Sequence, residues 1–250
     1  MRRFAATFLA AALLVITPLW AADEGAITVL CSNGIKAAVE ELAPRFERES
    51  HTKVAVTYDL AANLKRRIEA GDSFDVAILT PAAIDDLIKQ GKIAANGRTM
   101  IARSDLAVEM RAGARKPDLS TVDAFKNSLL NAKTIAYAKE GASGVLFVQT
   151  INKLGIADKI KGMPTATGEA VSAAVVTGTA EFGILPVSEI LPVKGAEVAG
   201  TFPGDARSFI EMVGGVSAMS QRATNARRFV EFLVGTQAAP VLKKTGMSRN

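Results

Sequence analysis

The chain contains one cysteine, Cys31, and one histidine, His51, among its 250 residues. A single cysteine cannot form an internal disulfide bond, and it cannot supply a metal site built from several thiolates. A catalytic mechanism of the Ser-His-Asp or Cys-His type would have to use His51. This histidine lies in the polar stretch ERESHTKV, between a predicted helix and a predicted strand. We therefore expect an exposed turn histidine, because a catalytic base must lie beside its nucleophile.

Sequence signals for nucleotides, nucleic acids and metal ions are also missing. There is no Gly-x-Gly fingerprint and no Walker A loop. Lysine and arginine residues are dispersed except at 65–67 and 226–228, and both clusters fall in helical patterns, where we expect solvated faces. The acidic residues form no dense group like a calcium-binding loop. The sequence therefore predicts no cofactor, no metal ion and no nucleic-acid partner.

Long hydrophobic runs are confined to residues 1–22. This segment begins with two arginines, continues as an apolar run over 5–20 and ends in two alanines, which is the layout of a secretory signal peptide. A membrane-spanning helix needs ~20 apolar residues, so this shorter run with Pro18 near its end makes an uncleaved anchor the less favoured alternative. We predict cleavage near Ala22 and export to the periplasm. The formal net charge then falls from +5 to +3, because both arginines are removed.

Short apolar runs alternate with amphipathic helical patterns from residue 27 onward. The apolar runs predict buried strands, and apolar residues spaced by three and four predict helices. Pro81 suits the first turn of a helix capped by Thr80, whereas Pro44 lies inside a predicted helix and should kink or shift it. Ser120 and Asp123 resemble a capping box. The predicted strands are 27–31, 53–58, 75–79, 106–110, 133–138, 181–186 and 209–219, and the predicted helices include 35–49, 62–70, 144–154 and 168–176.

The alternation of strands and helices predicts an α/β protein with mainly parallel sheets flanked by helices. The pattern restarts near residue 105, so we expect two cores of similar size, over 27–100 and 105–200. Two further helices, in 226–235 and 236–246, close the chain. Periodicity alone does not decide whether they return to the first core.

Three loops at the carboxyl ends of predicted strands lead into helices through small and polar residues. They are 31–34, 59–63 and 141–144. Ligands of open parallel sheets bind at these strand ends, and the N-termini of helices present backbone N–H groups to anions. Each loop alone could be an ordinary helix cap, because serine, asparagine and glycine are common there. Three such loops divided between two cores favour a shared site for an anion.

The order and spacing of these segments resemble the molybdate-binding-protein-like branch of bacterial periplasmic solute-binding proteins. The resemblance implies the type II fold, in which a ligand cleft lies between two lobes. It also implies that the signal peptide is 1–22, lobe 1 is 23–104 and 209–250, lobe 2 is 105–208, and the C-terminal helices pack on lobe 1. Such a protein clamps a small anionic ligand and delivers it to an ABC permease in the inner membrane; we expect a monomer. The segments that carry the resemblance are ITVLCSNGIKAAVEELAPRFE (27–47), VTYDLAANLKRRIEAGDSFDVAIL (56–79), KPDLSTVDAFKNSLLNAKTIAYAKEGASG (116–144), EFGILPVSEILPVKGAEVAG (181–200) and RRFVEFLVGTQAAPVLKKTGM (227–247).

The chain departs from the molybdate binders where those proteins carry hydroxyl groups. Gly34 replaces a serine after the first strand, Ala61 and Ala62 replace serines after the second, and Pro186 stands where a tyrosine is found. Fewer hydroxyls mean fewer charge-assisted hydrogen bonds to a tetrahedral dianion. We therefore expect a small organic acid, with molybdate or tungstate as the alternative. The predicted ligand-binding residues are Ser32, Asn33, Gly34, Ala62, Asn63, Ser143, Gly144 and Val171, and Arg103 could pair a ligand carboxylate or form a surface ion pair.

Two other roles are compatible with the same cleft. A ligand sensor that docks on a membrane receptor would have the same sequence features. An exported enzyme on this scaffold is disfavoured because His51 is the sole histidine and lies away from the three loops. We therefore predict a periplasmic solute-binding protein without catalytic residues.

Overall fold

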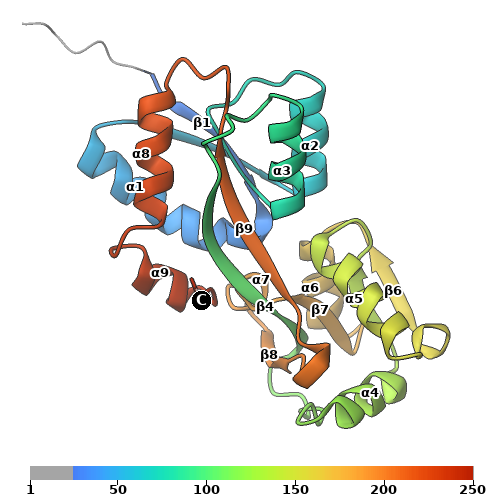
Figure 1. The fold of residues 1–250 in the computed structure, drawn as a ribbon. Coiled ribbons are helices and arrows are strands. Elements are labelled where there is room, and N and C mark those ends of the chain that lie inside the picture. The colour runs from blue at the N-terminus through green and yellow to red at the C-terminus, as the bar shows by residue number, and fades with distance from the viewer. Residues whose placement is uncertain (1–24, 250) are drawn as a thin grey trace, which may run out of the picture.

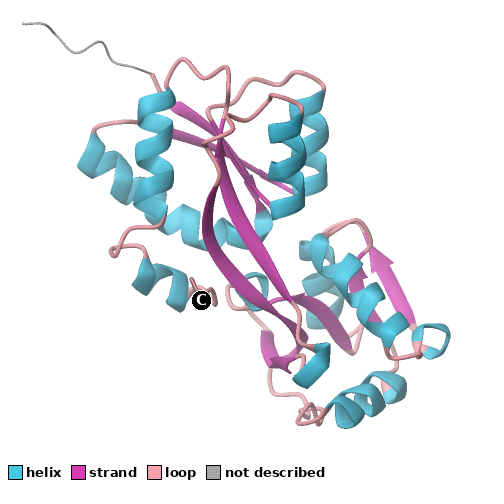
Figure 2. Ribbon diagram, viewed as in Figure 1, coloured by secondary structure: helices cyan, strands magenta, loops and turns pink. Residues whose placement is uncertain are grey.

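Two long strands join the two lobes of the molecule (Figure 1). The computed structural model describes residues 25–249, so the predicted signal peptide lies outside the described residues. The long strands are β4 (Thr99–Arg111) and β9 (Phe209–Val216). Helices flank the sheet in each lobe, which confirms the predicted two-lobed α/β fold (Figure 2).

Lobe 1 combines the N-terminal part of the chain with the C-terminal part. The sheet order is β2-β1-β3-β9-β4, in which β1 pairs in parallel with β2 and β3, and β9 pairs antiparallel with β3 and β4. The other elements are β1 (Ile27–Ser32), the 3-10 turn η1 (Asn33–Ile35), α1 (Lys36–Ser50), β2 (Val54–Asp59), α2 (Ala61–Glu69), β3 (Val76–Leu79), α3 (Pro81–Lys89), α8 (Ala223–Leu233) and α9 (Ala239–Lys244).

Alternate residues of β1 point to opposite faces of this sheet, as the two-residue period of a strand requires. Val29 and Cys31 belong to the core beneath α1, α8 and α9, whereas Leu30 packs against α2 and α3. Burial raises the pKa of the Cys31 thiol far above its usual range, so this cysteine acts as a small core residue.

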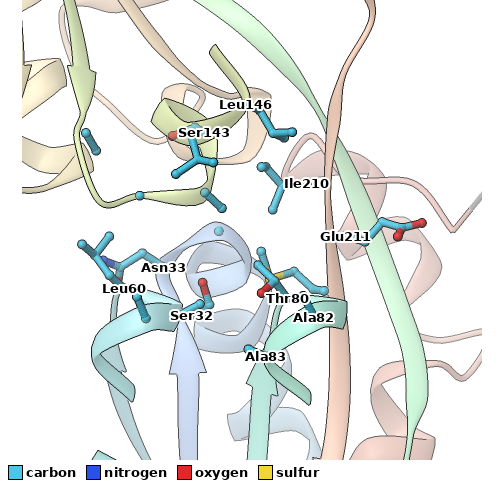
Figure 3. Close-up of a pocket in the computed structure, with 18 of the residues that line it drawn as sticks. Ser32, Asn33, Leu60, Thr80, Ala82, Ala83, Ser143, Leu146, Ile210 and Glu211 are labelled. Carbon is cyan, nitrogen blue, oxygen red and sulfur yellow. The ribbon is translucent and has the colours of Figure 1, made fainter. Parts of the chain in front are cut away.

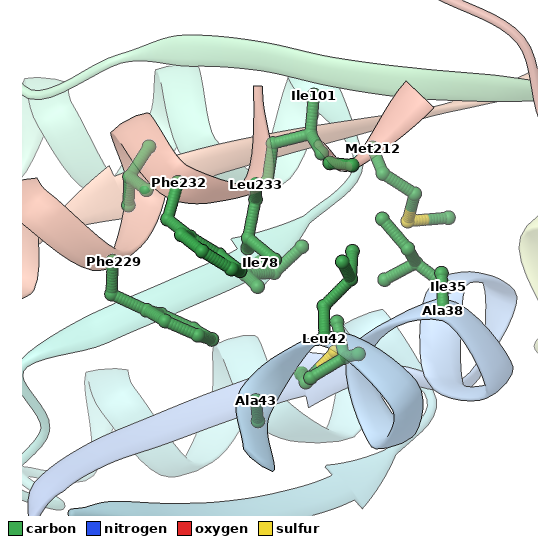
Figure 4. Packing of buried hydrophobic residues seen from close by; sticks show 14 of the residues in the cluster. Ile35, Ala38, Leu42, Ala43, Ile78, Ile101, Met212, Phe229, Phe232 and Leu233 are labelled. Carbon is green, nitrogen blue, oxygen red and sulfur yellow. The ribbon is translucent and has the colours of Figure 1, made fainter. Parts of the chain in front are cut away.

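Aromatic contacts join the helix α1 to the C-terminal helix α8. The ring of Phe46 packs edge to face against Phe229 and Phe232, with centroid distances of 5.1 and 5.5 Å. Figure 4 shows both α8 rings in the cluster that also contains Leu42 and Ala43 of α1. The C-terminal helices therefore pack against α1 of lobe 1.

Lobe 2 repeats the arrangement with a smaller sheet. β5 pairs in parallel with β6 and β7, and both β7 and β8 pair antiparallel with the second half of β4. Phe125 of α4 and Phe147 of α5 lie in one core cluster, and Val171 and Val175 of α6 lie in the other. The elements are α4 (Val122–Asn131), β5 (Ile135–Ala138), α5 (Ala142–Lys153), η2 (Ala157–Lys159), β6 (Gly162–Thr165), α6 (Gly168–Thr177), β7 (Phe182–Pro186), α7 (Val187–Ile190), β8 (Ala196–Thr201) and η3 (Gly204–Ala206).

Hydrogen bonds between side chains and backbone reinforce the crossing between the lobes. The Ser104 hydroxyl on β4 donates to the carbonyl oxygen of Gly246 at 2.9 Å and accepts from the N–H of Ser188 at 3.1 Å. The Ser188 hydroxyl donates to the carbonyl oxygen of Gly34 at 2.7 Å. β4, the C-terminal segment, the α7 helix of lobe 2 and the η1 turn of lobe 1 are thereby connected.

Some local features differ from the predictions. β4 begins at Thr99, whereas the predicted strand began at residue 106. The prediction missed the first half because the polar residues 103–105 interrupt the apolar run, although they pair with β9. The predicted capping box is wrong: Thr121 caps α4 by accepting from the N–H of Ala124 at 3.1 Å, and the Ser120 hydroxyl bonds Asp118 instead.

The strands β6 and β8 were not predicted, because they are short and no buried apolar run marks them. The helix α1 continues through Pro44, which is exposed. Within residues 25–249, no helix has the length and the apolar character that crossing a membrane requires.

We expect Phe46→Ala to lower the free energy of unfolding by about 3–5 kcal/mol, because it removes a buried ring that contacts two others. Urea denaturation followed by circular dichroism measures this change. Met219→Ala is the control, because the Met219 side chain is 80% exposed and its loss should cost less than about 0.5 kcal/mol. A loss below about 1 kcal/mol for Phe46→Ala would contradict the assigned packing of α1 on α8.

Candidate functional site

A cavity of about 590 Å³ lies between the lobes, beside β9 (Figure 3). Lobe 1 contributes the carboxyl ends of β1, β2 and β3 and the starts of the helices that follow them. Lobe 2 contributes the loop between β5 and α5. This is the position expected for a ligand of a parallel sheet, beyond the carboxyl ends of its strands. The lining residues include Ser32, Asn33, Gly34, Leu60, Ala61, Ala62, Thr80, Pro81, Ala82, Ala142, Ser143, Leu146, Glu189, Ile210 and Met212.

Four polar side chains in this lining are uncommitted. Ser32, Asn33 and Thr80 come from lobe 1 and Ser143 from lobe 2, and none of their side-chain atoms has a hydrogen-bond partner among the described residues. Ser32 and Ser143 are nevertheless 6% and 5% exposed. Hydroxyl and amide groups without a protein partner at a cavity wall are available for a ligand.

Three helices begin at the cavity, and their first turns add backbone donors. Leu60, Thr80 and Gly141 precede α2, α3 and α5, and none of these three residues caps its helix with a side chain. The leading N–H groups of a helix lack intrahelical partners and carry partial positive charge. The cavity therefore presents neutral donors and helix N-termini from both lobes.

The charged side chains around the cavity are largely paired with one another. Lys65 is the single cation among the lining residues, and it lies 2.6 Å from Glu69 and 2.8 Å from Asp86. Arg66 of lobe 1 lies 3.6 Å from Glu140 of lobe 2, so this ion pair spans the cleft. The described lining therefore offers neutral donors rather than a free cation. Among the described residues, no group of three or more His, Cys, Asp or Glu side chains is arranged to hold a metal ion.

Glu211 on β9 and Glu189 are the exceptions among these charged groups, because no described residue pairs with either; Glu189 is the one enclosed by the two lobes. Its carboxyl group lies between Gly34 and Gly168, and it borders both the main cavity and a side pocket of about 290 Å³. Burial, followed by the charges of Glu169 and Glu109, raises the pKa of Glu189 to about 7. Glu189 therefore exchanges a proton near neutral pH.

Glu109 lies deeper in lobe 2 and lines neither the cavity nor the side pocket. The residue is fully buried, and neither carboxyl oxygen accepts a well-formed hydrogen bond from the described residues. Burial raises the pKa of Glu109 to about 7, while the nearby Ser172 hydroxyl opposes this rise. Glu109 is a buried acid of the core.

The cavity brings together five of the eight residues predicted from the sequence: Ser32, Asn33, Gly34, Ala62 and Ser143. The other three lie outside its lining. The Asn63 amide donates to Asp59 at 2.8 Å, and Val171 is fully buried in the core. Gly144 packs directly against the carbonyl oxygen of Ala138, where a side chain would not fit.

Arg103 and His51 both lie outside the cavity lining. The guanidinium of Arg103 stacks over the Phe209 ring at 4.9 Å, and Phe209, not Arg103, lines the cavity. His51 is exposed and ends α1 in the left-handed conformation, as a turn residue.

Sequence reasoning missed Thr80 and Glu189. Thr80 follows the carboxyl end of β3, just as Ser32 lies at the carboxyl end of β1. The expectation that ligands bind beyond the carboxyl ends of parallel strands therefore also indicates Thr80. Glu189 is an acid in an otherwise apolar stretch after β7, but its orientation depends on the turn from β7 into α7.

Comparisons with known proteins confirm the resemblance to molybdate-binding proteins. The family model described as bacterial extracellular solute-binding protein matches residues 27–248. Aconitate isomerase of a Pseudomonas species is 31% identical, with 96% of this chain and 94% of that protein covered. The molybdate-binding protein ModA of Escherichia coli (strain K12) is 29% identical over 91% of this chain and 90% of its own. The periplasmic molybdate-binding protein of Azotobacter vinelandii shares the fold with a TM-score of 0.75, at 18% identity over 89% of this chain and 98% of its own.

We expect Glu109→Gln to raise the free energy of unfolding at pH 8 by about 1–3 kcal/mol. The folded chain holds the Glu109 proton more tightly than the unfolded chain, so its stability falls as pH rises from about 4.5 through about 7. The glutamine side chain does not titrate in this range. The decrease of stability with pH that remains in Glu109→Gln is then due to Glu189. Urea denaturation at pH 5 and pH 8 measures both effects. Glu49→Gln, at an exposed position, is the control. If stability falls equally between pH 5 and pH 8 in Glu109→Gln and in Glu49→Gln, the burial of the Glu109 charge is contradicted.

Proposed function

We propose that this chain, which belongs to the family of bacterial extracellular solute-binding proteins, captures a small organic anion between its lobes. Outside the cytoplasm it would then deliver the anion to an ABC permease. The observation that carries the proposal is the convergence of Ser32, Asn33 and Thr80 from one lobe with Ser143 from the other, all without protein partners. A ligand that bonds to both sets of donors holds the lobes together.

The lining of the cavity favours a carbon skeleton that carries carboxylates. Between the polar groups stand Leu60, Pro81, Leu146, Ile210 and Met212, which provide apolar contact. The cavity of about 590 Å³ falls in the range of ~300–1,000 Å³ that is usual for sites of small organic molecules. A tetrahedral oxyanion would leave these apolar walls without contact. The similarity to a protein named for aconitate, a tricarboxylate, supports the same choice.

Binding is expected to close the cleft by a hinge motion of the two lobes. β4 and β9 carry the chain across, and the ion pair of Asp105 with Arg207 lies at this crossing, with 3.0 Å between nitrogen and oxygen. The Arg66–Glu140 pair already spans the cleft. A permease would then recognise the closed form, in which both lobes have one fixed relative position.

We expect carboxylates to raise the melting temperature of the mature chain more than oxyanions do. A ligand at about 100 times its Kd adds about 2.7 kcal/mol to stability. The screen compares aconitate, citrate, malate and succinate with molybdate, tungstate and sulfate. Four hydroxyls are absent at positions 34, 61, 62 and 186, and the loss of even three contacts would weaken oxyanion binding by about 4.5 kcal/mol, or three powers of ten.

Two substitutions should weaken the binding of the carboxylate with the highest affinity. Asn33→Ala and Ser143→Ala should each raise its Kd from several-fold to about a hundredfold, because each removes a donor to a charged group. Asn131→Ala and His51→Ala, at exposed positions away from the cavity, should leave the Kd unchanged. A submicromolar Kd for molybdate, with weak binding of all four carboxylates, would contradict the proposed ligand class.

A second candidate function is isomerisation of an unsaturated polycarboxylate in the same cavity. Two observations favour it: the similarity to a protein named aconitate isomerase, and the carboxyl group of Glu189 at the cavity. Rotation about a carbon–carbon double bond requires temporary loss of its double-bond character, which a base can initiate by taking a proton from the adjacent carbon. An acid with a pKa near the working pH can both accept and return that proton.

Proton NMR of cis- and trans-aconitate mixed with the mature chain tests the second function. If the chain is an isomerase, the two isomers interconvert, and Glu189→Gln abolishes interconversion while Glu109→Gln retains it. Aconitate that binds without interconverting over several hours would eliminate catalysis and leave solute capture as the function.

A further inference from the structure

The carboxyl group of Glu189 is accessible from the cavity because two glycines surround it. A side chain at position 168 would collide with its Oε2 atom, and one at position 34 would lie 3.8 Å from its Oε1 atom. Gly34 belongs to lobe 1, whereas Gly168 and Glu189 belong to lobe 2. No described residue donates a hydrogen bond to either oxygen or forms an ion pair with it. The geometry thus leaves a carboxyl group with unused bonding capacity at the wall of the ligand cavity.

No cation of the described residues forms an ion pair with Glu189. Glu169 at the start of α6 and Glu109 on β4 both repel its charged form. The side pocket adds Glu40 and Lys36 of α1, and the Lys36 ammonium lies over the Tyr58 ring at 5.5 Å. These surroundings favour the protonated form of Glu189, which agrees with its pKa of about 7.

From this placement we infer that protonated Glu189 is a ligand contact: its hydroxyl donates a hydrogen bond to a carboxylate of the bound anion. This inference rests on the proposed function. A charged Glu189 would repel the same anion, whereas an O–H donor to a carboxylate forms a short, charge-assisted bond. The proton comes from solvent when the ligand binds, stays on Glu189 in the complex and returns to solvent when the ligand leaves. Binding of an anion and uptake of a proton are therefore coupled.

The sign of the pH dependence follows from this coupling. Below pH 7 Glu189 already carries its proton, so affinity is constant. Above pH 7 the competent fraction falls about tenfold per pH unit, and the Kd rises in proportion. A single carboxyl group has a pKa of about 4, and the negative charges of a polycarboxylate raise its last pKa, so Glu189→Gln is needed to separate the titration of Glu189 from that of the ligand.

Titration calorimetry of the mature chain with aconitate tests the coupling. We expect the Kd to be about 10- to 30-fold higher at pH 8.5 than at pH 6.5. At pH 7.5, titrations in phosphate and Tris, whose ionisation enthalpies differ, should show net uptake of a proton. Glu189→Gln should remove both the pH dependence and the uptake. Glu109→Gln is the matched control, because Glu109 has a similarly raised pKa but lies outside the cavity; it should retain both, with the pH dependence moved to lower pH because one charge that raises the pKa of Glu189 is lost.

Each outcome separates the coupling from the proposed function. An equal Kd at both pH values without proton uptake would overturn the coupling and leave solute binding intact. Loss of uptake in Glu109→Gln, but not in Glu189→Gln, would assign the proton to the core acid and also overturn it. If aconitate, citrate, malate and succinate all fail to bind at either pH, the proposed function fails and the coupling fails with it. Should Glu189→Gln not fold, proton uptake by the unaltered chain and by Glu109→Gln still decides.

Discussion

The backbone ladder between β4 and β9 is the connection on which the rest of this structure depends. β9 pairs with β3 on one side and with β4 on the other, so it holds the lobe 1 sheet together. Beyond Asp105, β4 continues into lobe 2 and pairs with β7 and β8. The chain has one cysteine, so no internal disulfide reinforces this crossing. The position of Ser143 relative to Ser32 is therefore set by hydrogen bonds along two strands.

Recognition and charge occupy different parts of the cavity. The donors that face a ligand are neutral, and the charged residues near them are mostly engaged in ion pairs such as Lys65 with Asp86. Neutral donors can remain hydrated in the open cleft and still bond a charged ligand when it closes. Glu189 is different, because it has no cationic partner, and burial and neighbouring acids raise its pKa. The inferred coupling to protons therefore rests on one carboxyl group in a lining of mostly neutral donors.

Local sequence patterns predicted most helices and strands, and they located the donors at strand ends. Ser32 and Asn33 follow an apolar run and precede a helix, so their place at the sheet edge follows from local rules. Val171 is buried in the core of lobe 2, and the Asn63 amide is bonded to Asp59, because the packing of each helix decides which of its faces meets the cavity. The sequences of β6 and β8 show no clear alternation of apolar and polar residues. These strands are therefore recognised only by their pairing with β5 and β4.

The sequence by itself determined the α/β class, the two repeated cores and the chemistry of the strand-end loops. These depend on periodicity and on residue type, which act over a few neighbouring residues. Only the tertiary structure decided that the loops of both lobes face one cavity, and that Glu189 enters it between two glycines. Gly34 and Gly168 are far apart in sequence, and their contact with one carboxyl group requires both lobes to be in place. Burial and the protonation of an acid are properties of such surroundings, so no local pattern can supply them.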